Sequence, residues 1–288
     1  MINFKGLFKM GGSVNKLTST VIALIGLVIL LALWYFLTAT GEIIPSKILP
    51  NPVAVIKSYG ELFTDYELLG NVWYSVQLNI YGYVTAIVLA LPIGFFIGMF
   101  PIARSLFSQY IDAFRFLPLT AITGIFIAWF GIGFDMKVSF LSFGILIYLL
   151  PVIVQRIAEL QNPSNSKDYV YLQTIQTLGA TNWQKFRHVY FPYVTEKISE
   201  DIRVLTAISW TYIIVAELLN KEGGIGAMIY TLGRQSRTPE VFALLFLIIL
   251  IGFLQDRLFK MLDVTLFPSK YNKESFLKTL FFKPVQPK

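Results

Sequence analysis

The sequence predicts an all-α integral membrane protein with about six transmembrane helices, and three observations support this prediction. Hydrophobic residues make up 55% of the 288 residues, charged residues only 14%, and the mean hydropathy is +0.63. Several uncharged or weakly charged stretches reach the length of about 20 residues that a helix needs to cross a bilayer. Basic residues flank these stretches, which is typical of membrane topology. The net charge of +7 is therefore attributed to topology, and we expect no nucleic-acid partner.

The composition also limits the chemistry of the chain. It has no cysteine, which excludes disulfides and thiolate metal sites. Its single histidine, His188, argues against a histidine-based metal site or proton relay and is expected on the cytoplasmic surface. No Gly-x4-Gly-Lys-Ser/Thr motif occurs. We therefore expect no catalytic residue, cofactor or metal in this chain, and any ATP and Mg²⁺ to be bound by a partner.

The first predicted transmembrane helix follows a short basic segment. Residues 17–41 carry no charge, and at about 1.5 Å per residue they can cross roughly 30 Å of hydrocarbon. A cleaved signal peptide is the alternative, but its apolar core usually has about 7–15 residues. An amphipathic piece with Val55, Ile56, Tyr59 and Phe63 then predicts a helix along the membrane surface.

Three further spans and a polar segment follow. A second span is expected at about 72–99, with Pro92 and Gly94 able to kink its far end. A third is expected at about 111–131, with Arg115 and Pro118 near its start, and a fourth at about 138–158. Residues 161–192 then form a polar island between hydrophobic stretches.

The polar island predicts two short helices hinged at a glycine. Gly179 lies where the end of a helix favours a left-handed residue. Thr181 and Gln184 have the spacing of a capping box, which begins a second helix. Pro192 is expected to restart the chain as it re-enters the membrane. Such a compact hairpin between spans is either a docking element or an ordinary structured loop.

The last third of the chain contains two more expected spans. The fifth, at about 193–218, has five charged residues in its first third, which must face protein or the water interface. A glycine-rich loop, Gly223-Gly224-Ile225-Gly226, precedes a short re-entry at 227–232, and the sixth span follows at about 241–262. Eighteen of the 24 Lys and Arg residues flank one side of these six spans. The positive-inside rule therefore places both termini and the hairpin in the cytoplasm.

Several motifs, taken together, resemble the permease subunits of binding-protein-dependent ABC importers. The spacing from Gly179-Ala180 through Phe186 to Phe191-Pro192 is similar to the cytoplasmic loop signature of that family, Glu-Ala-Ala-x3-Gly-x9-Ile-x-Leu-Pro. The nitrate/sulfonate/taurine/bicarbonate group is the most similar one. Its likeness covers about residues 47–263 and includes Ile48-Leu49-Pro50-x-Pro52, Arg115-x-x-Pro118, Trp129-Phe130-Gly131-Ile132, Trp210, Ile214-Val215-Ala216-Glu217 and Gly224-Ile225-Gly226.

The resemblance implies a type I importer permease fold with a cytoplasmic coupling helix, in a bacterial inner membrane. It divides the chain into an N-terminal segment (1–46), a permease core (47–263) and a basic tail (264–288). It further implies ABC ATPase subunits, an external solute-binding protein and a second permease copy, taken as identical, as partners. The residues that it implies in ATPase coupling are Gln173, Leu178, Gly179, Ala180, Trp183, Phe186 and Pro192. Gln173 departs from the family, which has glutamate there, so an ion pair at this point is lost.

Four residues are candidates for the translocation pathway of a small solute, which the resemblance suggests is an anion such as nitrate, bicarbonate or a sulfonate. They are Arg115, Arg203, Trp210 and Glu217. Each has a structural alternative. The arginines can neutralise neighbours, for Arg203 one of Glu200, Asp201 and Asp112. Trp210 can be packing, and Glu217 can bind Arg234, Arg237 or a backbone amide. An ion-gradient-driven secondary transporter or channel is the main alternative function, and a membrane scaffold is another.

Overall fold

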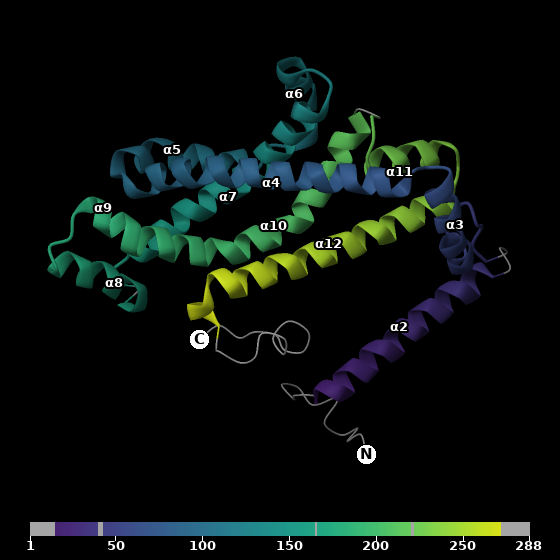
Figure 1. The fold of residues 1–288 in the computed structure, drawn as a ribbon, viewed down its shortest axis with the longest axis horizontal. Coiled ribbons are helices and arrows are strands. Elements are labelled where there is room, and N and C mark those ends of the chain that lie inside the picture. Colours follow the sequence, from purple (N-terminus) through teal and green to yellow (C-terminus); the bar gives the residue numbers. More distant parts are fainter. Residues whose placement is uncertain (1–14, 40–42, 165, 220–221, 272–288) are drawn as a thin grey trace. The chain divides into compact units, whose positions relative to one another are not determined.

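The computed structural model describes residues 15–39, 43–164, 166–219 and 222–271, and within these ranges the chain is helical and contains no strand (Figure 1). The basic residues before residue 15, Lys221 and the tail after residue 271 lie outside the described residues. Among the described residues, five helices are long and apolar enough to cross a membrane, or six if one bent pair counts as a span. This result confirms the prediction of an all-α protein with about six transmembrane helices. The chain divides into two compact units.

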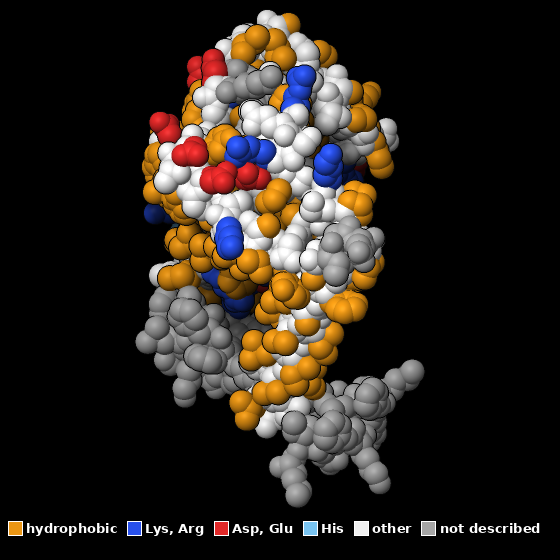
Figure 2. Space-filling view, turned by 90° about the vertical axis from the view of Figure 1, so that its right-hand side faces the viewer, with side chains coloured by type: hydrophobic (Ala, Val, Ile, Leu, Met, Phe, Trp, Pro, Cys, Tyr) orange, Lys and Arg blue, Asp and Glu red, His pale blue; other side chains and the backbone are white. Residues whose placement is uncertain are grey.

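The first unit contains residues 1–67 and 231–245. Its helix α2 (Lys16–Thr38) has no buried residue in its most apolar window, as expected of a helix surrounded by lipid. Figure 2 shows hydrophobic side chains covering the visible surface of this helix in the lower half of the view. The Trp34 indole donates a hydrogen bond to the Pro50 carbonyl (2.9 Å), and Asn51 caps α3 (Pro52–Thr64). The predicted short helix at Val55 is thus present.

The second unit contains residues 68–230 and 246–288 and is built on two long helices. Helix α4 (Leu68–Met99) packs along α7 (Phe134–Gln161). Glycines on α4 make the close approach possible, because a Cβ on Gly82 would lie 2.4 Å from Cδ2 of Leu141. Pro92 lies inside α4, and the helix continues through it.

The third span differs from the prediction of one helix at about 111–131. The chain forms α5 (Pro101–Phe114), a 3₁₀ turn (η1, Leu119–Ile122) and α6 (Thr123–Phe130), and it bends by 96° between α5 and the following segment. Pro118 explains the break, since it cannot donate a backbone hydrogen bond and disfavours the helical conformation of the preceding residue. Pro118 is visible in the sequence, but the hydrophobicity of the whole stretch predicted one straight span and did not indicate the bend.

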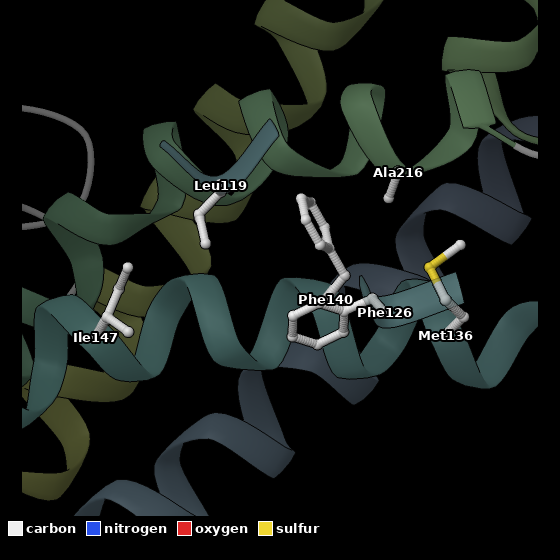
Figure 3. Packing of buried hydrophobic residues seen from close by; sticks show 6 residues of the cluster. All are labelled: Leu119, Phe126, Met136, Phe140, Ile147 and Ala216. Carbon is white, nitrogen blue, oxygen red and sulfur yellow. The ribbon is translucent and has the colours of Figure 1, made fainter. Parts of the chain in front are cut away.

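A cluster of buried hydrophobic side chains joins the bent segment to α7 and to α10 (Phe191–Leu219), as Figure 3 shows. The rings of Phe126 and Phe140 meet edge to face, with their centroids 5.5 Å apart. The cluster consists of Leu119, Phe126, Met136, Phe140, Ile147 and Ala216. Helices α11 (Ile225–Arg234) and α12 (Thr238–Leu266) and a final 3₁₀ turn (η3, Pro268–Lys270) complete the described chain.

Candidate functional site

The hairpin begins with helix α8 (Ser166–Thr177), and the turn that follows it is centred on Gly179, the predicted hinge. Gly179 has a φ of +70°, in the left-handed region that glycine adopts without strain. The amide of Ala180 donates to the carbonyl of Ile175 (3.3 Å), and that of Gly179 to Gln176 (3.0 Å). This pair of bonds is a Schellman motif, which satisfies the last carbonyls of the helix.

The second half of the hairpin begins with the predicted capping box. The Thr181 amide donates to Oε1 of Gln184 (2.8 Å), and the Gln184 amide donates to Oγ1 of Thr181 (3.3 Å). Helix α9 (Asn182–Lys185) then continues through a π turn (η2, Phe186–Tyr190) into α10. The predicted restart at Pro192 is therefore wrong. The widened π turn directly before the proline leaves room for its ring, so the helix passes through it.

An aromatic cluster attaches the hairpin to α4. The ring of Phe186 lies edge-on to Phe95 of α4, with centroids 5.2 Å apart, and Phe191 stacks on Phe95 at 6.0 Å. Trp183 stacks on Phe186 (5.4 Å). Because Phe95 is buried, this cluster anchors the base of the hairpin in the interior of the unit.

Polar contacts brace the same base. Arg104 of α5 donates to Oε1 of Gln161 (2.7 Å), the last residue of α7, and Gln161 in turn donates to the Tyr190 hydroxyl (3.0 Å). The Tyr193 hydroxyl donates to Oδ2 of Asp168 on α8 (2.9 Å). The hairpin is therefore bonded to the helices on both sides of it.

The tip of the hairpin, in contrast, is exposed. Leu178 is 78% exposed and Trp183 65%, large values for such apolar side chains. Gln173, Gly179 and Pro192 are also exposed, whereas Ala180 and Phe186 are half-buried. The structure thus brings the seven residues predicted for coupling into one braced hairpin with an apolar tip.

Two of the four pathway candidates form ion pairs. Arg115 pairs with Asp112 one helical turn earlier (2.9 Å) and lies at the break after α5. Arg203 pairs with Asp256 of α12 (3.0 Å), which corrects the prediction of Glu200, Asp201 or Asp112 as its partner. Those three acids bind Lys270, Arg156 and Arg115 instead. The mistake arose because local sequence does not show which helix faces α10.

Arg203, Trp210 and Glu217 are seven residues apart, which places them on one face of α10. Trp210 is 5% exposed, and its indole donates to Oε1 of Gln255 on α12 (2.7 Å). Glu217 is fully buried. This face of α10 is therefore packed against other helices of the same chain, and Arg115 does not belong to it.

The Glu217 carboxylate is bound at both oxygens. Oε1 accepts a hydrogen bond from the Ser75 hydroxyl (2.5 Å), and Oε2 accepts one from the Gly226 amide (2.7 Å). The alternative of a backbone amide partner was thus the correct one. Burying a carboxylate requires such bonds, since an unpaired buried charge is very costly.

Sequence reasoning missed a polar stripe on α4 that faces α10. Asn71, Ser75, Asn79 and Tyr83 recur every four residues, the spacing of one helical face. Asn79 donates to the Ser209 hydroxyl (3.0 Å), and Tyr83 to that of Thr206 (3.4 Å). This spacing in an uncharged span was the signal that could have revealed the stripe.

Sequence reasoning also missed Lys137 on α7 as a functional candidate, because the topology prediction treated it only as a positive charge outside the membrane. It is fully buried, and its ammonium group donates to the Tyr74 hydroxyl (3.1 Å). The same group lies 4.9 Å from the centre of the Tyr74 ring, a cation–π distance. No metal-binding group of three or more His, Asp or Glu side chains occurs among the described residues.

Comparisons with known proteins agree on one family. Residues 86–266 match the family described as binding-protein-dependent transport system inner membrane component. A probable ABC transporter permease protein of Brucella melitensis is 29% identical over 230 residues, which cover 80% of this chain and 89% of that protein. The putative aliphatic sulfonates transport permease protein of Bacillus subtilis is 26% identical, covering 82% of each chain. The taurine transport system permease protein of Escherichia coli is 27% identical, covering 80% of this chain and 82% of that one.

Proposed function

The chain belongs to the family of binding-protein-dependent transport system inner membrane components, and from this premise we propose that it forms the membrane pathway of an ATP-driven importer for a small anion. Nucleotide is bound and hydrolysed by separate ATPase subunits, and an external binding protein delivers the solute. One observation carries the proposal: a hairpin braced at its base exposes an apolar tip, Leu178 and Trp183.

The exposed tip supports docking of an ATPase. Exposed apolar side chains gathered on a rigid support are typical of protein interfaces. The Gly179 turn and the Thr181 capping box fix the tip, while the Phe95 cluster and the Arg104–Gln161–Tyr190 contacts join it to α4, α5 and α7. A movement imposed on the tip is therefore transmitted to the membrane helices.

The orientation and assembly are part of the same proposal. The basic residues beside the hairpin favour its location in the cytoplasm, together with both termini. The opposite end of the spans then faces the binding protein. A second, identical permease copy completes the pathway.

The solute class rests on the relatives. Two of them are named for the transport of aliphatic sulfonates and of taurine, both of which carry a sulfonate group. We infer a small organic sulfonate or a similar oxyanion as the solute of this chain. Competition among taurine, an alkanesulfonate, nitrate and bicarbonate for uptake orders these candidates.

Reconstitution tests the function directly. The chain is purified with the ATPase and binding protein that associate with it in its own cells, and the complex is placed in liposomes. We expect ATP-dependent uptake of one of the four labelled anions and ATP hydrolysis stimulated by the binding protein. Uptake driven by a proton or sodium gradient without ATP would overturn the proposal.

A hairpin variant tests the coupling role. Gly179→Val places a β-branched residue at a φ of +70°, which costs about 1–3 kcal/mol locally and displaces the tip. We expect uptake to be lost while the chain remains in the membrane. Gly60→Val is the matched control, because Gly60 lies within helix α3 and an added Cβ there meets no atom within 4 Å. Transport at the wild-type rate in Gly179→Val would refute the coupling role.

One feature favours the alternative of an ion-driven carrier. Glu217 is a buried carboxylate inside a span, the type of group that binds protons or cations in such carriers. Its oxygens, however, are bound by Ser75 and by the Gly226 amide, and that arrangement suggests a structural task.

A further inference from the structure

The glycine-rich loop is attached to the membrane helices by three successive backbone amides. The Gly224 amide donates to Oδ1 of Asn71 (2.8 Å), and the Ile225 amide to the Ser75 hydroxyl oxygen (2.9 Å). The Gly226 amide donates to Oε2 of Glu217 (2.7 Å). Two helices of the second unit, α4 and α10, therefore hold the first turn of α11.

Glycine is required for this contact at two positions. Gly224 has a φ of +103°, and a Cβ there would lie 2.2 Å from Cδ of Glu217. A Cβ on Gly226 would lie 2.9 Å from the carbonyl oxygen of Ile214 and 3.0 Å from Cβ of Glu217. Any larger residue would push the loop away from the carboxylate.

Charge adds to the contact. The carboxylate of Glu217 lies at the N-terminus of α11, where the helix dipole favours a negative group. The same hydroxyl of Ser75 that accepts from Ile225 donates to Glu217, so one side chain serves two partners. Charge-assisted bonds of this kind are roughly twice as strong as neutral ones.

We propose that Glu217 is a positioning residue that latches the Gly224–Gly226 segment onto α4 and α10 and so stabilises the closed state of this end of the pathway. Both of its oxygens already accept hydrogen bonds, from Ser75 and from the Gly226 amide. The inference rests on the proposed function for its orientation and for the ATP-driven cycle. A latch that favours one of two states keeps the other sparsely populated, so weakening it raises the population of the open state.

Cysteine labelling tests the latch on the permease alone. The chain has no cysteine of its own, so single substitutions can be labelled without background. Ala227, in the first turn of α11, is only 6% exposed. We expect a membrane-impermeant maleimide, added from the periplasmic side, to label Ala227→Cys slowly. Combining Glu217→Gln with Ala227→Cys should raise the labelling rate about tenfold. The glutamine side chain is uncharged, and an NH2 donor replaces one of the two accepting oxygens of Glu217.

Three variants control this measurement. Glu196→Gln is the same change on the same helix, near the hairpin, and should leave the rate unchanged. Ile48→Cys, at a position 69% exposed, should label rapidly in every background. Ser75→Ala removes the hydroxyl between Ile225 and Glu217, and it should raise the rate as Glu217→Gln does. If Glu217→Gln does not reach the membrane, Ser75→Ala provides the test of the latch.

ATP hydrolysis provides a readout that a purely structural defect would not raise. In the reconstituted complex, we expect Glu217→Gln to increase hydrolysis in the absence of binding protein severalfold. Glu217→Asp, which keeps the charge, should lie between Glu217→Gln and the wild type. Unchanged labelling of Ala227→Cys in both Glu217→Gln and Ser75→Ala would refute the latch. Increased labelling in a complex that never hydrolyses ATP would support the latch and refute the ATP-driven function instead.

Discussion

At the hairpin end of α10 the apolar side chains of Leu178 and Trp183 face solvent, whereas at the other end the carboxylate of Glu217 is fully buried. The 29 residues of α10 separate these two ends by about 43 Å. The Glu217 end satisfies its polar groups within the chain, through Asn71, Ser75 and three loop amides. The hairpin tip leaves its apolar side chains exposed. One end of α10 is therefore saturated by contacts within the chain, whereas the other end presents apolar surface, which is the surface proposed above for docking.

The largest expected effect is a loss of stability, and its size should differ between Gly224 and Gly179, two glycines with positive φ. Gly224→Ala places a methyl group against the Glu217 carboxyl, whereas Gly179→Ala adds one where no atom lies within 4 Å. We expect Gly224→Ala to reduce the free energy of unfolding by about 3 kcal/mol or more. Gly179→Ala should cost only about 1–2 kcal/mol, from backbone strain. Thermal unfolding of both variants in detergent measures the difference, and equal losses would remove the distinction between the two ends.

The next effect concerns the exposed tip. Trp183→Ala should reduce co-purification of the ATPase at least about tenfold, because buried tryptophans dominate many interfaces. Stability of the isolated chain should change little, since Trp183 is 65% exposed. Trp129→Ala, at a tryptophan 72% exposed on α6, is the matched control. Wild-type recovery of the ATPase with Trp183→Ala would show that the tip is not the docking surface.

A smaller effect is expected from the capping box. Thr181→Ala removes the side chain that accepts from the Gln184 amide, at a typical cost of about 1 kcal/mol. If the tip must be held in place for docking, ATPase affinity should fall by up to about fivefold. Thr195→Ala loses only bonds to two carbonyls of its own helix, so it should leave the affinity unchanged. Titration of the ATPase onto the permease in detergent distinguishes the two variants.

The smallest effect is a gain. Gln173→Glu restores the charge that the resembling family has at this exposed position. A surface ion pair is worth about 0–1 kcal/mol, so ATPase binding should strengthen by about fivefold or less. The gain should disappear at high salt. A gain that persists in high salt would indicate a contact other than an ion pair.

The sequence predicted the helices that depend on local rules. Neighbouring residues alone determine three of these features, and the structure confirms them: the Gly179 turn, the Thr181–Gln184 capping box and the uncharged spans. The bend at Pro118 and the continuous helix through Pro192 were not predicted. Both concern a proline whose effect depends on packing, and hydrophobicity alone cannot distinguish a broken helix from a straight one.

The site was less predictable, because its contacts join residues far apart in the chain. Glu217 could be singled out, but its partner Ser75 lies 142 residues away. Lys137 was read as a charge at the membrane surface, and only the tertiary fold shows it buried beside Tyr74. The roles of the hairpin residues in coupling and the boundaries of the three segments remain predictions.

The 96° bend after α5 has a consequence for the way this segment meets a bilayer. Helix α6 has eight residues and extends only about 12 Å, less than half of the hydrocarbon thickness. Hydrocarbon does not tolerate an irregular backbone with unpaired polar groups, unless protein or a water-filled cavity shields it. Residues 115–118 form an irregular turn. The amides of Phe116 and Leu117 still donate to the carbonyls of Ala113 and Phe114, and the Phe116 side chain is 85% exposed. The α5–η1–α6 segment therefore does not form an ordinary straight span, and protein or water, not hydrocarbon alone, solvates the turn at its centre.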